Sequence, residues 1–140
     1  MTTTLSSYDL SHIVGELQPL VGAKIEKIFQ QEKPKDDFLL SLHVPGVGKK
    51  YIFISLPSIV CESSFKPSFP KLPPQFCSSL RRKISGARIQ SITQRGFERI
   101  IEIELSFKDR KSLLVIELFS TGNIILVDEH NKVLDAMKRI

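Results

Sequence analysis

Ile101-Glu102-Ile103-Glu104-Leu105-Ser106-Phe107, residues 101–107, is the clearest structural signal in this chain. Apolar and polar side chains alternate at every position, and a period of two is typical of a β-strand with one buried face. The polar residues 108–111 then predict a turn, and residues 113–119 predict a central strand because they are apolar on both faces. Three shorter strands are expected around these two, at residues 89–92, 124–127 and 133–137. The second half of the chain therefore predicts an antiparallel meander.

The first half of the chain shows a similar pattern. Phe38, Leu40, Leu42 and Val44 alternate with Leu39, Ser41 and His43, which predicts a half-buried strand. Turn-forming residues flank this segment, and further strands are expected at 23–31 and 51–56. This half therefore predicts a second antiparallel meander. The fold class that follows is α+β, with the two meanders packed on each other as an antiparallel β-sandwich.

Two short helices complete the predicted domain. The first runs from Ser6 to Pro19, with apolar residues at helical spacing and with Ser6 and Asp9 in the pattern of a capping box. The second, over residues 73–86, begins with two prolines and ends at a glycine. Residues 57–74 hold five of the eight prolines. Because this segment is also rich in apolar residues, we expect an ordered surface loop rather than a linker.

The composition is that of one globular domain over residues 1–140, with 41% hydrophobic and 25% charged residues. No run approaches the roughly 20 apolar residues of a membrane span, and the N-terminus lacks the features of a secretory signal. Cys61 and Cys77 are not in a CxxC motif, so we expect free thiols in a reducing cytoplasm. The sequence predicts no metal site and no cofactor, since it contains none of the common hydrolase, phosphate-binding or dinucleotide-binding motifs.

The net charge of +5 is concentrated in residues 81–99, and the rest of the chain is balanced. The six cations of this segment, here called the basic stripe, are Arg81, Arg82, Lys83, Arg88, Arg95 and Arg99. Such a concentration on an otherwise neutral protein indicates a polyanionic partner, most often nucleic acid. The cations at residues 81–83 also lie in the last turn of a predicted helix, where they complement the helix dipole.

Glu98 and Arg99 form the pair of greatest interest, because they follow a glycine at the end of the basic stripe. One interpretation is a local ion pair at the entry to a strand, which contributes little to stability when exposed. The other is a nucleotide site, in which the carboxylate accepts from base amino groups and the guanidinium binds phosphate or stacks on a base. Asp9 likewise has two interpretations, as a helix-capping acid or as a second acceptor at that site.

Several blocks of the sequence also resemble the N-terminal domain of the NFACT family, which includes the ribosome quality-control factors NEMF and RqcH and the bacterial fibronectin-binding-protein-like proteins. The resemblance runs along essentially all 140 residues, with the blocks in order. The blocks are Ser7-Tyr8-Asp9-Leu10, Glu16-Leu17-Gln18, Leu20-Val21-Gly22-Ala23-Lys24-Ile25, Pro73-Pro74-Gln75-Phe76-Cys77, Leu80-Arg81-Arg82-Lys83, Gly96-Phe97-Glu98-Arg99-Ile100 and Gly122-Asn123-Ile124-Ile125-Leu126-Val127-Asp128.

The resemblance implies a function in ribosome quality control. Such proteins bind a large ribosomal subunit that still holds peptidyl-tRNA, recruit tRNA and promote addition of C-terminal residues to the stalled chain without mRNA. The ribosome makes the peptide bonds, so the resemblance implies no enzyme activity. It also implies a cytoplasmic protein and a longer chain, of which these residues would be an excised N-terminal domain.

The resemblance assigns roles to four residues. Asp9 matches an aspartate in the family's first helix, and Arg99 matches the arginine of an Asp-Arg pair that follows a glycine. Glu98 stands where the family usually has the aspartate of that pair. Asn123 is the residue that carries over from a conserved turn of the family. The resemblance therefore implies a tRNA-binding site at Asp9, Glu98 and Arg99.

Two other functions remain open at this point. The family domain is similar in fold to the N-terminal domain of formamidopyrimidine-type DNA glycosylases, which suggests a nucleic-acid-processing enzyme. Those enzymes use an N-terminal proline followed by glutamate, whereas this chain has Thr2 and Thr3, so glycosylase chemistry is disfavoured. The other function is a protein-interaction module, which would associate through an apolar patch on the proline-rich loop and be insensitive to salt.

Overall fold

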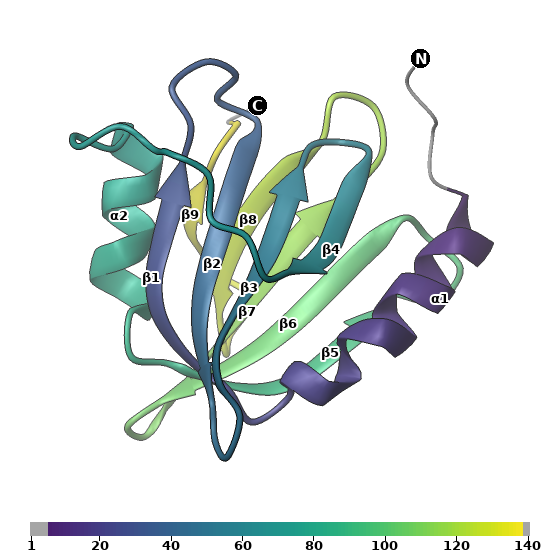
Figure 1. The fold of residues 1–140 in the computed structure, drawn as a ribbon. Coiled ribbons are helices and arrows are strands. Elements are labelled where there is room, and N and C mark those ends of the chain that lie inside the picture. Colours follow the sequence, from purple (N-terminus) through teal and green to yellow (C-terminus); the bar gives the residue numbers. More distant parts are fainter. Residues whose placement is uncertain (1–5, 139–140) are drawn as a thin grey trace.

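A computed structural model describes residues 6–138 of the chain (Figure 1). Within that range the structure is α+β, with one antiparallel sheet of nine strands in the order β4-β3-β2-β1-β5-β6-β7-β8-β9. The strands are β1 Lys24–Gln30, β2 Asp37–Val44, β3 Gly48–Ser55, β4 Ile59–Ser63, β5 Arg88–Gln94, β6 Ile100–Phe107, β7 Arg110–Glu117, β8 Asn123–Asp128 and β9 Val133–Ala136. Two α-helices, α1 Ser7–Leu17 and α2 Gln75–Ile84, accompany the sheet, and a 3₁₀ turn at Gln18–Leu20 follows α1.

The two predicted meanders are present, but their separation into two sheets is wrong. The backbone of β1 pairs with the start of β5, and this pairing joins the meanders into a continuous sheet. The Ile89 amide donates to Ala23 at 2.8 Å, and the Ile25 amide donates to Ala87 at 2.8 Å. The pairing satisfies backbone groups of β1 that an open sheet edge would leave without partners.

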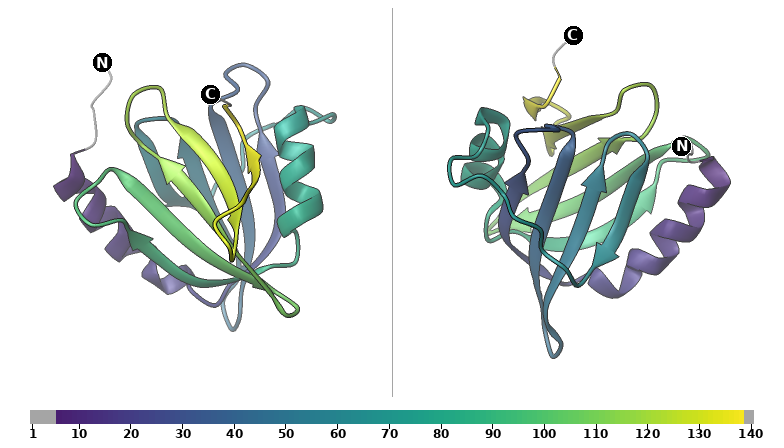
Figure 2. Two further views of the ribbon diagram at one scale, coloured as in Figure 1. Left: turned by 180° about the vertical axis from the view of Figure 1, so that it is seen from behind. Right: turned by 45° about the horizontal axis from the view of Figure 1, so that its top comes forward.

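The sheet curves so that the apolar faces of the two meanders meet in one core (Figures 1 and 2). The alternation predicted for residues 101–107 is confirmed over most of its length, since Ile101, Ile103 and Leu105 are buried and the intervening acids are partly exposed. The helices cover two opposite sides of this arrangement (Figure 1). The first helix, α1, packs against β4 and β5, and α2 packs against β1 and β9, so each helix joins the two meanders.

The proline-rich segment 57–74 departs from the prediction, because it contains strand β4. Residues 59–63 pair with β3 along their whole length, from Ser55 with Ile59 to Tyr51 with Ser63. The segment is short and lies between prolines, so its own pattern is too weak to indicate a strand. The exposed edge of β3 supplies the hydrogen-bonding partners, and the strand forms through that long-range pairing.

Three further observations concern the described residues. Cys61 is exposed and Cys77 is buried, and both are free thiols, as predicted. No helix in residues 6–138 has the length and apolar character needed to cross a membrane. In the same range, no three His, Cys, Asp or Glu side chains come together as a candidate metal site.

Candidate nucleic-acid interface

The first turn of α1 forms one side of the candidate site. Ser6 is the N-cap residue, and its hydroxyl accepts from the Asp9 amide at 3.0 Å. The Asp9 carboxylate accepts in return from the Ser6 amide at 3.3 Å, so the predicted capping box is confirmed. Asp9 is exposed, and its carboxylate therefore has further acceptor capacity on the solvent side.

The turn between β5 and β6 forms the other side of the site. The Glu98 amide donates to the Arg95 carbonyl at 3.0 Å, which closes a four-residue turn around Gly96. Gly96 has a φ of 55°, a left-handed conformation that favours glycine at this position. Glu98 is exposed at the end of the turn, and Arg99 is half-buried where β6 begins. The Arg99 carbonyl accepts from the Leu118 amide at 2.8 Å, which fixes the backbone of this residue against the segment after β7.

Gln94 holds these two sides together. Its side-chain amide donates to the Ser7 carbonyl of α1 at 3.0 Å and to the Glu98 carbonyl at 2.8 Å. A cavity of about 680 Å³ lies at this junction. It is lined by Ser6, Ser7, Phe97, Glu98, Arg99, Ile100 and Phe119. The structure therefore brings Glu98 and Arg99 beside the start of the helix that carries Asp9.

Aromatic side chains around this cavity were not among the residues selected from the sequence. Phe97, at the tip of the β5–β6 turn, is 93% exposed, and Tyr8 on α1 is 72% exposed. Phe97 and Phe119 both line the cavity, whereas Tyr8 does not. Large exposed aromatics are the usual platforms on which unpaired bases stack. The sequence signal that could have identified Phe97 is an aromatic residue directly between a turn glycine and a charged pair.

Arg95 lies next to this site but is engaged in a salt bridge. Its guanidinium is 2.6 Å from the Glu102 carboxylate, on the neighbouring strand. The hydrogen bond to Glu102 raises the pKa of Arg95 further above its high ordinary value, with contributions from the charges of Glu98 and Glu117. Arg95 is therefore a fixed cation, and much of its charge is offset by Glu102.

The remaining members of the basic stripe lie away from this junction. Arg81, Arg82 and Lys83 are on α2, which covers the opposite side of the molecule from α1 (Figure 1). Arg81 donates to the Ile28 carbonyl at 2.6 Å, and Lys83 is 3.2 Å from the Asp135 carboxylate. Arg88 donates to the Gly22 carbonyl at 2.7 Å. The stripe is therefore continuous in sequence but divided between two flanks in space.

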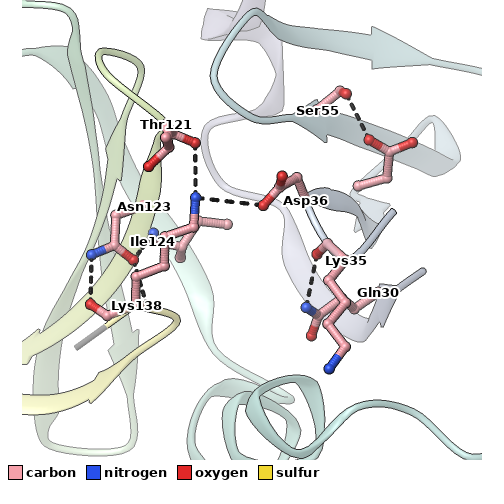
Figure 3. A network of polar contacts seen from close by, with 9 residues as sticks. Gln30, Lys35, Asp36, Ser55, Thr121, Asn123, Ile124 and Lys138 are labelled. Carbon is pink, nitrogen blue, oxygen red and sulfur yellow. Dashed lines mark hydrogen bonds and ion pairs between the residues drawn. The ribbon is translucent and has the colours of Figure 1, made fainter. Parts of the chain in front are cut away.

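Asn123 has a structural position in the fold. The residue is only 8% exposed. Its side chain joins β8 to the segment after β9 (Figure 3). The side-chain oxygen accepts from the Ile124 and Lys138 amides, both at 2.9 Å, and the side-chain nitrogen donates to the Lys138 carbonyl at 2.9 Å. Asn123 does not line the cavity at Arg99. Thr2 and Thr3, the residues that argue against glycosylase chemistry, lie outside the described residues.

Comparison with protein families gives a match over residues 6–140 to the model described as NFACT N-terminal and middle domains. The archaeal Rqc2 homolog aRqcH of Methanocaldococcus jannaschii is 28% identical over 141 residues, which cover 99% of this chain and 21% of that protein. Ribosome quality control complex subunit 2 of Saccharomyces cerevisiae is 28% identical over 141 residues, which cover 100% of this chain and 13% of that protein. The Rqc2 homolog RqcH of Streptococcus pneumoniae is 32% identical over 156 residues, which cover 98% of this chain and 26% of that protein.

Two solved structures share the fold. The N-terminal domain of the fibronectin-binding protein PavA from Streptococcus pneumoniae superposes with a TM-score of 0.86 at 29% identity, covering 96% of this chain and 54% of that one. The N-terminal part of the fibronectin/fibrinogen-binding protein from Streptococcus suis gives a TM-score of 0.88 at 28% identity, covering 98% of this chain and 54% of that one. The chain thus spans about half of these structures, and about a quarter or less of the three relatives compared by sequence.

Proposed function

The chain belongs to the family of NFACT N-terminal and middle domains, and from this we propose that it is the tRNA-binding part of a ribosome quality control factor. The compared relatives carry the names of ribosome quality control factors in an archaeon, a yeast and a bacterium. In this proposal the domain works in the cytoplasm on a large ribosomal subunit that holds peptidyl-tRNA. It recruits tRNA for tailing of the stalled chain, and the ribosome forms the peptide bonds.

One observation carries the proposal. Gln94 fixes the Glu98–Arg99 turn to the start of α1, the helix that carries Asp9, and an exposed aromatic, Phe97, lines the same cavity as Glu98 and Arg99. An unpaired base needs such a surface, because its face stacks on an aromatic ring or a guanidinium and its edge donates to carboxylates. The loops of tRNA offer unpaired bases, whereas a regular duplex does not.

The charges at the site favour base contacts over simple attraction of phosphate. Arg95 and Arg99 are accompanied by Glu98, by Asp9 on α1 and by Glu102, which binds Arg95. A surface with this balance of charges has little excess positive potential, so long-range attraction to the RNA backbone would come from other cations of the chain. We therefore assign selection of RNA to Arg99 and its neighbours, and general attraction to the dispersed cations. The expected likeness to glycosylase domains stays a prediction.

The test compares the RNA bound by three forms of the full-length protein: unchanged, Arg99→Ala and Arg110→Ala. Arg110 is an exposed cation at the start of β7, so its removal is a matched change in charge outside the site. Sequencing of the copurified RNA should show tRNA with the unchanged protein and with Arg110→Ala, and a strong loss with Arg99→Ala. Equal tRNA recovery from all three forms would reject the proposed site.

A further inference from the structure

A second cavity, of about 500 Å³, lies on the flank opposite the Arg99 site, between α2, β9 and the end of β1. The helix α2 and the strand β9 lie side by side in the front and back views (Figures 1 and 2). Polar residues that line the cavity include Gln30, Lys35, Gln75, Ser79 and Arg82. Its volume is in the range of small-molecule sites, which are typically concave with a few converging polar groups.

Gln30 gives this cavity an unsatisfied acceptor. The residue is 2% exposed, and its side-chain nitrogen donates to the Lys35 carbonyl at 2.8 Å. That bond fixes the orientation of the amide, and the oxygen Oε1 is buried without a hydrogen-bond partner among residues 6–138. Figure 3 shows Oε1 directed away from the Lys35 carbonyl and toward α2, and the Lys35 side chain extends the same way. Buried acceptors are nearly always paired, so Oε1 is ready to accept a hydrogen bond from a donor placed in the cavity.

The start of α2 supplies the complementary preference for an anion. Pro74 is the N-cap residue and offers no side-chain cap, and the first turn holds no acid. The Ser78 amide donates to the Pro74 carbonyl at 3.1 Å, which is the first hydrogen bond of the helix. The amides of residues 75–77 come before it and therefore have no acceptor within the helix. Pro74 and Gln75 border the cavity, so the positive end of the helix dipole lies beside it.

The charged side chains agree with this preference. Arg82 and Lys35 both line the cavity. The acid that lines it, Asp135, is 7% exposed and is paired with Lys83 at 3.2 Å, so its charge is offset. The net charge of the side chains that line the cavity is therefore positive, and its potential adds to that of the positive end of α2.

We propose that this cavity is a second binding site, for a phosphate ester that also carries a hydroxyl group, as the ribose phosphate of a nucleotide or an RNA segment does. The start of α2, Arg82 and Lys35 hold the phosphate, and a ribose hydroxyl donates to Oε1 of Gln30. Phe76 and Met137 supply apolar lining for the carbon face of the sugar. This site is separate from Arg99 and does not rest on the function proposed above.

The test is calorimetric titration of the 140-residue chain with ribose 5-phosphate and with inorganic phosphate. The unchanged chain should bind ribose 5-phosphate about tenfold more tightly, because the hydroxyl bond to a buried acceptor is lost with inorganic phosphate. Gln30→Met keeps the size of the side chain and should abolish this preference. Arg82→Ala and Lys35→Ala, both changes of exposed residues, should weaken binding of both ligands, whereas Arg110→Ala should not.

Competition then identifies the source of the ligand. A short oligoribonucleotide that displaces ribose 5-phosphate at lower concentration than a mononucleotide does would identify RNA, and equal displacement would identify a free nucleotide. Equal affinities of the unchanged chain for the two phosphates would refute the role of Gln30. Binding that survives both Arg82→Ala and Lys35→Ala would refute the site itself, and these two variants are readable even if Gln30→Met lowers the melting temperature.

Discussion

Single residues at the Arg99 site combine structural and proposed binding roles. Asp9 is the clearest case, because its carboxylate completes a capping box and also stands, exposed, on the helix that borders Glu98 and Arg99. Glu98 is different, since the contacts that fix it run through its backbone amide and carbonyl. Variants can therefore separate the two roles if each is paired with a control that shares its structural effect.

Ser6→Ala and Asp9→Ala form such a pair. Each removes one half of the capping box, and each should lower the free energy of unfolding by about 1 kcal/mol, measured by denaturant titration. Only Asp9→Ala also removes an acceptor proposed for a base edge, so its tRNA affinity should fall about fivefold further than that of Ser6→Ala. Equal tRNA affinities of the two variants would show that Asp9 acts only as a cap.

Glu98 allows a test of charge at nearly constant shape. Glu98→Gln keeps the size of the side chain and removes the charge, so tRNA affinity should fall if the carboxylate accepts from bases or orients Arg99. Glu98→Asp keeps the charge and should be tolerated, or should raise tailing activity in the full-length protein. Stability should change by less than about 0.5 kcal/mol in either variant, because Glu98 is exposed. A loss in Glu98→Asp as large as that in Glu98→Gln would contradict a role for the charge.

At the scale of elements, α2 shows how cations that are adjacent in sequence differ in function. Arg81 packs onto the sheet: its guanidinium donates to the Ile28 carbonyl at 2.6 Å and lies 5.4 Å from the centre of the Phe29 ring. Arg82 is exposed and faces the second cavity. The same hydrogen-bonded region holds Cys77, whose thiol donates to the Ile28 carbonyl and whose pKa is raised by burial, an effect that Arg81 partly opposes.

Arg81→Ala should therefore destabilise the fold by about 1.5–3 kcal/mol, the usual contribution of a hydrogen bond from a charged group. Arg82→Ala should change stability by less than about 0.5 kcal/mol. Denaturant unfolding of the two single variants measures the difference directly. Equal stabilities would mean that the bond to Ile28 makes no net contribution.

Local patterns were enough to predict most elements, but not how they meet. The alternation at residues 101–107 and the capping box at Ser6 are short-range signals, and both are present in the structure. Strand β4 forms only because β3 offers an edge, and the β1–β5 pairing joins segments some 60 residues apart. For the same reason the sequence could not show that Gln94 joins α1 to the β5–β6 turn. It also could not show that the basic stripe would divide between two flanks.

At the scale of the whole molecule, the two meanders are held together at several places besides the β1–β5 pair. The loop between β7 and β8 lies against the end of β3, where Gly122 approaches Leu56 and Pro57. The Lys138 ammonium is 3.6 Å from the Asp36 carboxylate and donates to the Thr121 carbonyl at 2.9 Å (Figure 3). These contacts join the second meander to the first.

Gly122→Ala tests the close approach between the meanders. Gly122 has a φ of 82°, and an added Cβ would lie 2.8 Å from Cβ of Leu56. Gly46→Ala is the control, because Gly46 has a similar φ of 78° with nothing within 4 Å of the added atom. Both variants bear the cost of a left-handed alanine, but Gly122→Ala should lose about 1–3 kcal/mol more through overpacking. Equal losses would mean that the β7–β8 loop moves away freely.

The central claim is that the Glu98–Arg99 turn, fixed against α1, is a site for reading tRNA. The most direct measurement is the affinity of full-length protein for tRNA at one salt concentration, with Arg99→Ala compared with Arg110→Ala, alongside the melting temperature of each. Loss of base stacking on the guanidinium, about 1–3 kcal/mol, predicts an affinity about 10- to 100-fold weaker for Arg99→Ala, with a melting temperature within about 5 °C of the unchanged protein. Unchanged affinity together with a much lower melting temperature would show that Arg99 is structural and would contradict the claim.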